Sequence, residues 1–391
     1  MTTQFDRPLV SVITIFLNGE RFIREAIESI LTQTMDSWEL LLVDDGSTDR
    51  STEIALWYEK EHPAKIKYFE HKGHRNLGMS ASRQLGVAVA QGKYITFIDA
   101  DDIWLPERLE RHLKVFEMFP SAVMVCSPTL YWFNWQPGSN EWVGERDYVG
   151  HLFLPTGDLI YSTVSLPLFL GTGNAPAPCS LTVPREILVR VGGFEHIFRG
   201  LYEDQVAIFK MCLAGPIVAI EDVLDRYRQH RDSMCRRTGA VGLYPTEVQP
   251  GRKEFLDWLE RYLTELSHPD QNLWEELRAQ LWPYRHPRLA QADMLRRRVV
   301  SLKRKVKRRV VHRITSKIRE LLPKILFQWL SSVPQGIQRE GRLEGTVATS
   351  GLTEPKLSGV RAAYEATGVT PARIARQFGI SRSDVRKAVL S

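Results

Sequence analysis

The order of apolar segments in residues 9–102 limits the fold more than any other feature. Short runs rich in Val, Ile and Leu, such as LVSVITIFLN at 9–18, alternate with segments of helical periodicity, such as GERFIREAIESILTQT at 19–34. Such runs predict strands buried on both faces, and their alternation with helices predicts a parallel sheet covered by helices on both sides. The predicted strands are 9–18, 38–49, 65–71 and 92–102, and the predicted helices are 19–34, 51–62, 76–91 and, further along, 183–196 and 201–215.

Two groups of aspartates stand at the ends of these predicted strands: Asp44 with Asp45, and Asp99 with Asp101 and Asp102. In open sheets of this type, ligands bind at the carboxyl ends of the strands. Like charges this close repel each other unless a cation lies among them, so a divalent-metal site is one interpretation. The other is a solvated turn in which an aspartate caps the following helix. Two acidic groups at two strand ends favour the metal site.

Five segments occur in the order and spacing of the family 2 glycosyltransferases, so that residues 8–235 resemble this family. They are VSVITIFLNGERFIREAIESILTQT, LLLVDDGSTDRS, NLGMSASRQLGVAVAQGKYITFIDADD, VGGFEH and YEDQVAIFKMCLAG. The resemblance implies a GT-A fold, which is a Rossmann-like mixed α/β sheet with helices on both faces. It also implies an enzyme that uses a nucleotide-sugar donor and a divalent cation, Mg²⁺ or Mn²⁺, and inverts the configuration of the anomeric carbon.

The resemblance also implies which residues bind the donor. The end of the first strand, with Ile15 and Phe16, is expected to border the nucleotide base and ribose. Asp45 is expected to accept a hydrogen bond from the base. Arg75 and Arg83 are expected to face the diphosphate.

The metal and the catalytic base are assigned in the same way. Asp101 is expected to bind the metal, Asp99 the metal or the ribose, and Asp102 to lie behind them. His230 is a candidate near the phosphates and the metal, with a structural histidine as the equal alternative. Asp204 is expected to be the general base that takes the proton of the acceptor hydroxyl. Without the resemblance, a carboxylate that interacts with a helix dipole would explain Asp204.

Charge is distributed unevenly along the 391 residues, whose net charge is +6. Residues 241–391 contain 28 Lys and Arg against 15 Asp and Glu, whereas residues 1–240 contain 24 against 31. Between Arg296 and Arg319 there are twelve basic residues and no acidic one, and apolar residues recur every three or four positions. The segment 296–330 therefore predicts a basic amphipathic helix on an anionic membrane surface, with a coiled coil, nucleic-acid binding or a solvated helix as alternatives.

The C-terminal part contains two further segments. Residues 331–358, rich in Gly, Ser, Thr and Pro, predict a linker. Residues 359–391 resemble the helix-turn-helix of resolvases and repressors, which implies DNA as a partner; a small helical bundle without DNA binding is the equal alternative. The predicted domains are a catalytic domain at 1–240, a helical region at 241–330, the linker at 331–358 and the small domain at 359–391.

Several features bear on location and function. The four cysteines lie far apart, the N-terminus lacks the apolar segment of a signal peptide, and no apolar run approaches the length of a membrane span. These features predict a cytoplasmic protein, peripheral on the cytoplasmic membrane face.

The aromatic-rich segment 123–180 predicts irregular structure, either a small core or a sugar-binding cleft. The predicted function is sugar transfer to a glycan or lipid-linked acceptor; the alternative is a DNA-binding or scaffold protein with a degenerate transferase domain as a sugar-nucleotide sensor.

Overall fold

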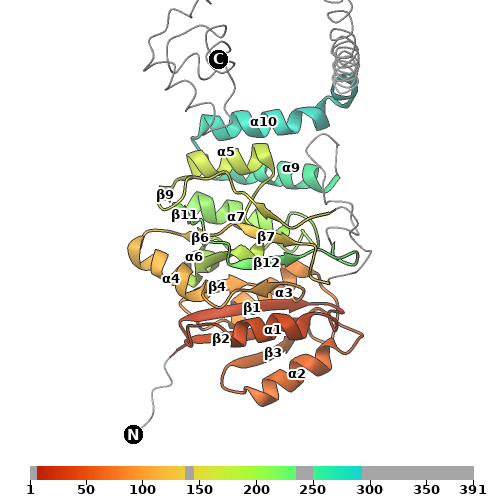
Figure 1. Ribbon diagram of the computed structural model, residues 1–391. Coiled ribbons are helices and arrows are strands. Elements are labelled where there is room, and N and C mark those ends of the chain that lie inside the picture. The colour runs from red at the N-terminus through yellow and green to blue at the C-terminus, as the bar shows by residue number, and fades with distance from the viewer. Residues whose placement is uncertain (1–6, 137–144, 235–249, 293–391) are drawn as a thin grey trace, which may run out of the picture. The chain divides into compact units, whose positions relative to one another are not determined.

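A computed structural model describes residues 7–136, 145–234 and 250–292 of the chain (Figure 1). All of them belong to the first of two units into which the chain divides; this unit ends at Lys303 and the second begins at Arg304. The predicted basic helix at 296–330, the linker at 331–358 and the helix-turn-helix at 359–391 lie outside the described residues.

Eight strands form one mixed sheet: β1 (Val10–Phe16), β2 (Trp38–Asp44), β3 (Ile66–Glu70), β4 (Tyr94–Phe97), β6 (Met124–Cys126), β9 (Leu159–Ile160), β10 (Leu181–Pro184) and β11 (Ile217–Ala219). Their order across the sheet is β3-β2-β1-β4-β10-β6-β11-β9. The first four strands in this order are parallel, as the sequence predicts. β10 runs antiparallel to both of its neighbours, β4 and β6, which makes the sheet mixed.

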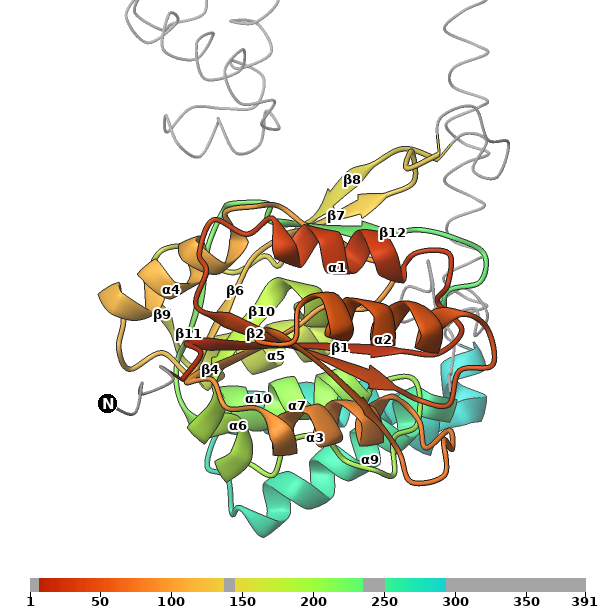
Figure 2. The same ribbon diagram turned by 90° about the horizontal axis from the view of Figure 1, so that it is seen from below.

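Helices cover both faces of this sheet: α1 (Ile23–Leu31), α2 (Ser51–Glu61), α3 (Met79–Val89), α4 (Arg108–Met118), α5 (Ser162–Thr172), α6 (Arg185–Arg190), α7 (Glu203–Ala214), α9 (Pro250–Glu265) and α10 (Gln271–Arg285). Figure 2 shows α1, α2 and α4 on one face and α3, α6 and α7 on the other. The predicted mixed α/β sheet with helices on both sides is confirmed. The helix predicted at 183–196 begins later, because residues 181–184 form β10.

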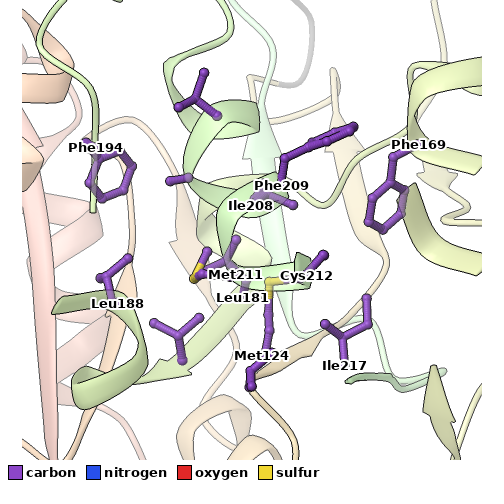
Figure 3. Packing of buried hydrophobic residues seen from close by; sticks show 14 of the residues in the cluster. Met124, Phe169, Leu181, Leu188, Phe194, Ile208, Phe209, Met211, Cys212 and Ile217 are labelled. Carbon is purple, nitrogen blue, oxygen red and sulfur yellow. The ribbon is translucent and has the colours of Figure 1, made fainter. Parts of the chain in front are cut away.

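Two apolar cores lie on opposite faces of the sheet, since successive residues of a strand point to opposite sides. In β1, Ile13 and Ile15 belong to the first core, and Val12 and Phe16 to the second. Gly86 lets α3 approach β1 closely, because a Cβ atom there would lie 2.6 Å from Cγ2 of Ile13. Figure 3 shows part of the first core, where α5, α6 and α7 meet the sheet through Met124, Phe169, Leu181, Leu188, Ile208, Phe209 and Ile217.

Helices α9 and α10 extend the first core. Their buried residues belong to the same cluster as those of α7: Phe255, Leu256, Trp258, Leu259 and Leu263 on α9, and Leu273, Leu277 and Leu281 on α10. Residues 250–285 therefore share a core with the sheet, whereas the catalytic domain was predicted to end at residue 240; that boundary stays a prediction. In the described part of the chain, no helix has the length and apolar character required to cross a bilayer.

The prediction of irregular structure for 123–180 is wrong. Besides β6 and β9, this segment contains α5, β7 (Thr129–Trp132) and β8 (Tyr148–Gly150). β7 and β8 join β5 (Ile103–Trp104) and β12 (Asp225–Arg228) in a small sheet with the order β5-β12-β7-β8. The strands are too short to show a period, and Pro167 inside α5 argues locally against a helix.

Candidate active site

Ile15 and Phe16 and the predicted acidic groups lie at the carboxyl ends of β1, β2 and β4. Parallel strands end on the same edge of a sheet, so the acidic groups after β2 and β4 lie on either side of β1. Two later segments reach this edge: the N-terminus of α7 and residues 228–230 at the end of β12.

Asp44 closes the turn that follows β2. Its Oδ1 accepts hydrogen bonds from the backbone N–H groups of Gly46 at 3.0 Å and Ser47 at 2.7 Å. Its Oδ2 accepts from the Thr52 hydroxyl at 2.5 Å and the Tyr68 hydroxyl at 3.3 Å. The side chain is fully buried. Asp44 therefore has a structural role, as the turn interpretation of these acids expects.

Asp45 holds the segment that enters α3. Its carboxylate accepts hydrogen bonds from the backbone N–H of Leu77 at 2.8 Å and of Gly78 at 3.0 Å, and Nε2 of His71 lies 3.6 Å away. Gly78 is the N-cap of α3 with φ +93°, a conformation that favours glycine. The carboxylate thus meets backbone amides of its own protein; the predicted hydrogen bond to a nucleotide base stays a prediction.

The three aspartates after β4 differ from this pair in their partners. The side chains of Asp99 and Asp101 are 31% and 27% exposed. Oδ1 of Asp99 accepts from the Arg83 guanidinium at 2.6 Å, and Oδ2 of Asp101 lies 2.8 Å from Nε2 of His230. Burial raises the pKa of Asp99, as does the neighbouring charge of Asp101, while Arg83 opposes the rise. Carboxylate oxygens thus crowd together at a partly open edge of the sheet.

Asp102 is buried behind them and ties this loop to β12. Its Oδ1 accepts from the backbone N–H of Arg228 at 3.0 Å, and its Oδ2 has no hydrogen-bond partner among the described residues. The Arg228 guanidinium donates to the backbone oxygen of Asp101 at 2.8 Å and to Glu25 at 2.7 Å. It also lies over the rings of Phe22, Trp132 and Trp135, about 5 Å from each centroid. These contacts hold the 99–102 loop from behind.

Arg83 connects this loop to α7. It is a buried residue of α3 whose guanidinium donates to Asp99 and also to Oε1 of Glu203, 120 positions later in the chain. Burial opposes protonation, but the charges of Asp99 and Glu203 outweigh it and raise the pKa of Arg83. A permanently charged guanidinium between two carboxylates fixes their relative positions.

Glu203 and Asp204 form the first turn of α7. Burial raises the pKa of Glu203 to about 8, against the opposing charge of Arg83. Burial also raises the pKa of Asp204, again opposed by Arg83. Asp204 is only partly buried, and its Oδ1 accepts from the backbone N–H of Gln205 at 2.8 Å. The Glu203 carboxylate therefore anchors the turn to Arg83, and Asp204 is the less buried acid of the pair.

The remaining predicted residues lie apart from these contacts. Ile15 and Phe16 are buried in the two cores, so a nucleotide at this strand end would meet mainly their backbone. Arg75 is exposed, and its Nε donates to the backbone oxygen of Lys72 at 3.2 Å. The sequence did not single out Arg228 or Glu203, although each adjoins a predicted residue or segment: Arg228 lies in YRQHRDS, and Glu203 precedes Asp204.

Comparison with known proteins finds similarity in the part of the chain that forms the first strands and helices. Residues 11–156 match the family model described as glycosyl transferase family 2. These residues are therefore similar to the domain of the family 2 glycosyltransferases. An uncharacterized glycosyltransferase of Nostoc, alr2836, is 30% identical over 224 residues, which are 56% of this chain and 65% of the relative. A candidate teichuronic acid biosynthesis glycosyltransferase of Bacillus subtilis, TuaG, is 38% identical over 109 residues, 28% of this chain and 42% of the relative. The chain thus spans less than two thirds of either relative.

Among solved structures, residues 1–349 of S. aureus TarS in complex with UDP-GlcNAc superpose with a TM-score of 0.52 and 18% sequence identity, over 70% of this chain and 71% of TarS 1–349. This likeness concerns the fold. Together with the match to the family model, it identifies the mixed sheet as the GT-A-like fold that the sequence resemblance implied. The resemblance of residues 359–391 to a helix-turn-helix stays a prediction, because these residues lie outside those that the structure describes.

Proposed function

We propose that this protein transfers a sugar from a nucleotide-sugar donor to a hydroxyl group of a glycan or lipid-linked acceptor, with inversion of the anomeric carbon. The observation that carries the proposal is the position of Arg83. Its guanidinium contacts Asp99 on the donor side and Glu203 on the α7 side. Two acidic groups more than 100 residues apart are thereby held at one site. A displacement at the anomeric carbon requires such an arrangement, with a base on one side of the carbon and the leaving group on the other.

A divalent cation fits the residues on the donor side. Mg²⁺ and Mn²⁺ prefer oxygen ligands, and Mg²⁺ is commonly held by one or two carboxylates together with substrate phosphates. Asp101 and Asp99 offer two partly exposed carboxylates, while the described residues contain no group of three His, Cys, Asp or Glu side chains that would enclose an ion. Asp101 and Asp99 would hold the cation, with His230 either orienting Asp101 or acting as a further ligand. When bound, the cation neutralises charge that develops on the departing diphosphate.

Asp204 is the proposed general base. A bond forms between the acceptor oxygen and the anomeric carbon, the bond from that carbon to the diphosphate oxygen breaks, and the hydroxyl proton moves to the Asp204 carboxylate. Because bond formation and cleavage occur on opposite sides of the carbon, its configuration inverts. Asp204 suits this role better than Glu203, whose buried carboxylate is already bound to the Arg83 guanidinium.

UDP-GlcNAc is the first donor to test, because TarS, whose fold is similar, is described in complex with it. The name of TuaG supports a glycan as the acceptor. We propose in addition that the basic segment 296–330 attaches the enzyme to an anionic membrane surface, which would bring it to lipid-linked acceptors. Flotation with vesicles that contain anionic lipid, compared with neutral vesicles, tests this attachment.

The function is tested with a panel of UDP-, GDP- and dTDP-sugars in the presence of Mn²⁺ or chelator. A donor at one hundred times its Kd should stabilise the protein by about 2.7 kcal/mol in thermal unfolding. With that donor, Asp204→Asn should bind normally but release the nucleoside diphosphate about 10²–10⁴-fold more slowly.

Since burial raises the pKa of Asp204, the wild-type rate should fall on acidification at a pH above the usual value of 3.8. No turnover with any donor, together with salt-dependent retention on DNA, would instead support the sugar-nucleotide sensor.

A further inference from the structure

The segment that leads into the proposed base has an unusual backbone. Tyr202 is the N-cap of α7 and has φ +69° and ψ 3°, the left-handed conformation. Residues other than glycine, asparagine and aspartate rarely adopt it, and it persists only where the surroundings enforce it. Its backbone oxygen accepts from the N–H of Val206 at 3.1 Å and so opens the first helical turn. The conformation of Tyr202 therefore sets the direction in which Glu203 and Asp204 leave the loop.

Helix α9 supplies the surroundings that enforce this conformation. The ring of Phe255 stacks on the ring of Tyr202 with centroids 5.4 Å apart and an interplanar angle of 11°. At Gly251, one turn earlier, a Cβ atom would lie 3.6 Å from Cε2 of Tyr202, so the helix backbone itself covers the ring. Phe255 is fixed in turn, because it is buried and packs edge-on against Phe209 of α7 at 5.3 Å.

The same face of α9 contacts this segment at a second point. Trp258, three residues after Phe255, packs edge-on against Phe198 with centroids 6.2 Å apart. Arg252, three residues before Phe255, is buried and lies against Tyr202; it donates to the backbone oxygen of Leu170 at 2.9 Å. Three positions on one side of a helix thus hold the segment that ends at Tyr202, and tie it to α5.

From these contacts we infer that Tyr202 and Phe255 are positioning residues for the reaction: α9 locks Tyr202 in its left-handed conformation and thereby aims Asp204 at the acceptor hydroxyl. The inference rests on the proposed function, since it assumes that Asp204 is the base. It assigns a catalytic contribution to residues 250–258, which lie well beyond the segment 11–156 that matches the family model. Tyr202 and Phe255 act through Asp204 and do not contact the substrate themselves.

The test compares two ways of removing the lock in the full-length protein. Phe255→Ala removes the stacking partner. Tyr202→Gly removes the ring and permits the left-handed backbone without enforcing it, because glycine adopts positive and negative φ about equally readily; it should therefore remain folded even where Phe255→Ala does not. Each variant should release UDP from UDP-GlcNAc, or from the donor that the panel selects, at least about 10-fold more slowly at saturating donor. The KM for the donor and the Kd for UDP should stay close to wild type, because the donor side is untouched.

Two control variants separate positioning from stability. Leu277→Ala removes a fully buried side chain of α10 from the same core, so it should lower the melting temperature without slowing turnover. Tyr202→Phe keeps the stacked ring and should restore a rate close to wild type. The inference is overturned if Tyr202→Gly turns over at the wild-type rate, or if Leu277→Ala slows turnover as much as Phe255→Ala. Asp204→Asn, measured in parallel, separates the proposed function from the further inference. An active Asp204→Asn refutes the proposed base. An inactive Asp204→Asn together with an active Tyr202→Gly refutes only the positioning role of Tyr202.

Discussion

The two acidic groups on either side of β1 look alike in the sequence but differ in what they bind. After β2, the carboxylates of Asp44 and Asp45 accept hydrogen bonds from backbone amides of nearby loops. After β4, Asp99 and Asp101 are partly exposed and face the side chains of Arg83 and His230. An acid whose oxygens accept from backbone amides stabilises a turn, while an acid that faces other side chains and solvent can exchange them for a ligand. The comparison points to the β4 group for chemistry and the β2 group for stability.

The largest expected effect is on turnover at the β4 group. Asp101→Asn removes one of two carboxylates that would hold the cation, so it should slow nucleoside-diphosphate release by about 10²–10³-fold, as expected when one electrostatic stabiliser of a transition state is lost. The melting temperature without ligand should change little, because the side chain is partly exposed and contacts the ring of His230. Initial rates at varied Mn²⁺ measure the effect. Asp222→Asn, which neutralises an exposed acid, is the control, and an Asp101→Asn enzyme of wild-type speed would remove the distinction between the groups.

The next effect is on stability at the β2 group. Asp44→Ala removes the acceptor of four hydrogen bonds in a fully buried turn, so it should lower the free energy of unfolding by about 2–4 kcal/mol. Urea denaturation measures this loss. Asp44→Asn keeps an oxygen that can accept from the two turn amides and should lose less than half as much. A fully stable Asp44→Ala variant with impaired donor binding would contradict the structural role of Asp44.

These differences also show how far the sequence alone leads. The apolar runs of β1 and β2 and the apolar spacing in α1 made the elements and their order predictable, since they depend on local pattern. The contact of Arg83 with Glu203 was not, because local periodicity carries no information on pairs 120 residues apart. That Arg83 faces the diphosphate stays a prediction, and the role of residues 250–258 beside Tyr202 had no signal in the sequence.

A third carboxylate, Asp225, extends the comparison with Asp44, because its contribution to stability should depend on pH. Asp225 of β12 is as buried as Asp44, but its hydrogen bonds to the Ser127 hydroxyl, at 3.5 Å, and to the Cys179 thiol, at 3.6 Å, are long side-chain contacts. Burial raises its pKa from 3.8 to about 6, although Arg108 opposes the rise. A group whose pKa is higher in the folded than in the unfolded protein stabilises the fold below the unfolded pKa, and this contribution is lost as the pH rises through the folded pKa.

The free energy of unfolding of wild type should therefore fall relative to that of Asp225→Asn as the pH rises from about 4.5 to about 7.5. The difference between the two proteins should change by about 2 kcal/mol in favour of the variant. Urea denaturation at the two pH values measures this difference. Replacing the neutral carboxyl by an amide adds a difference that should be equal at both pH values, because Arg108 does not titrate in this range: burial lowers its pKa only to about 10. If the difference in unfolding free energy between variant and wild type does not change with pH, the prediction is wrong. The side-chain donors around Asp225 would then stabilise its ionised carboxylate as well as backbone amides stabilise that of Asp44.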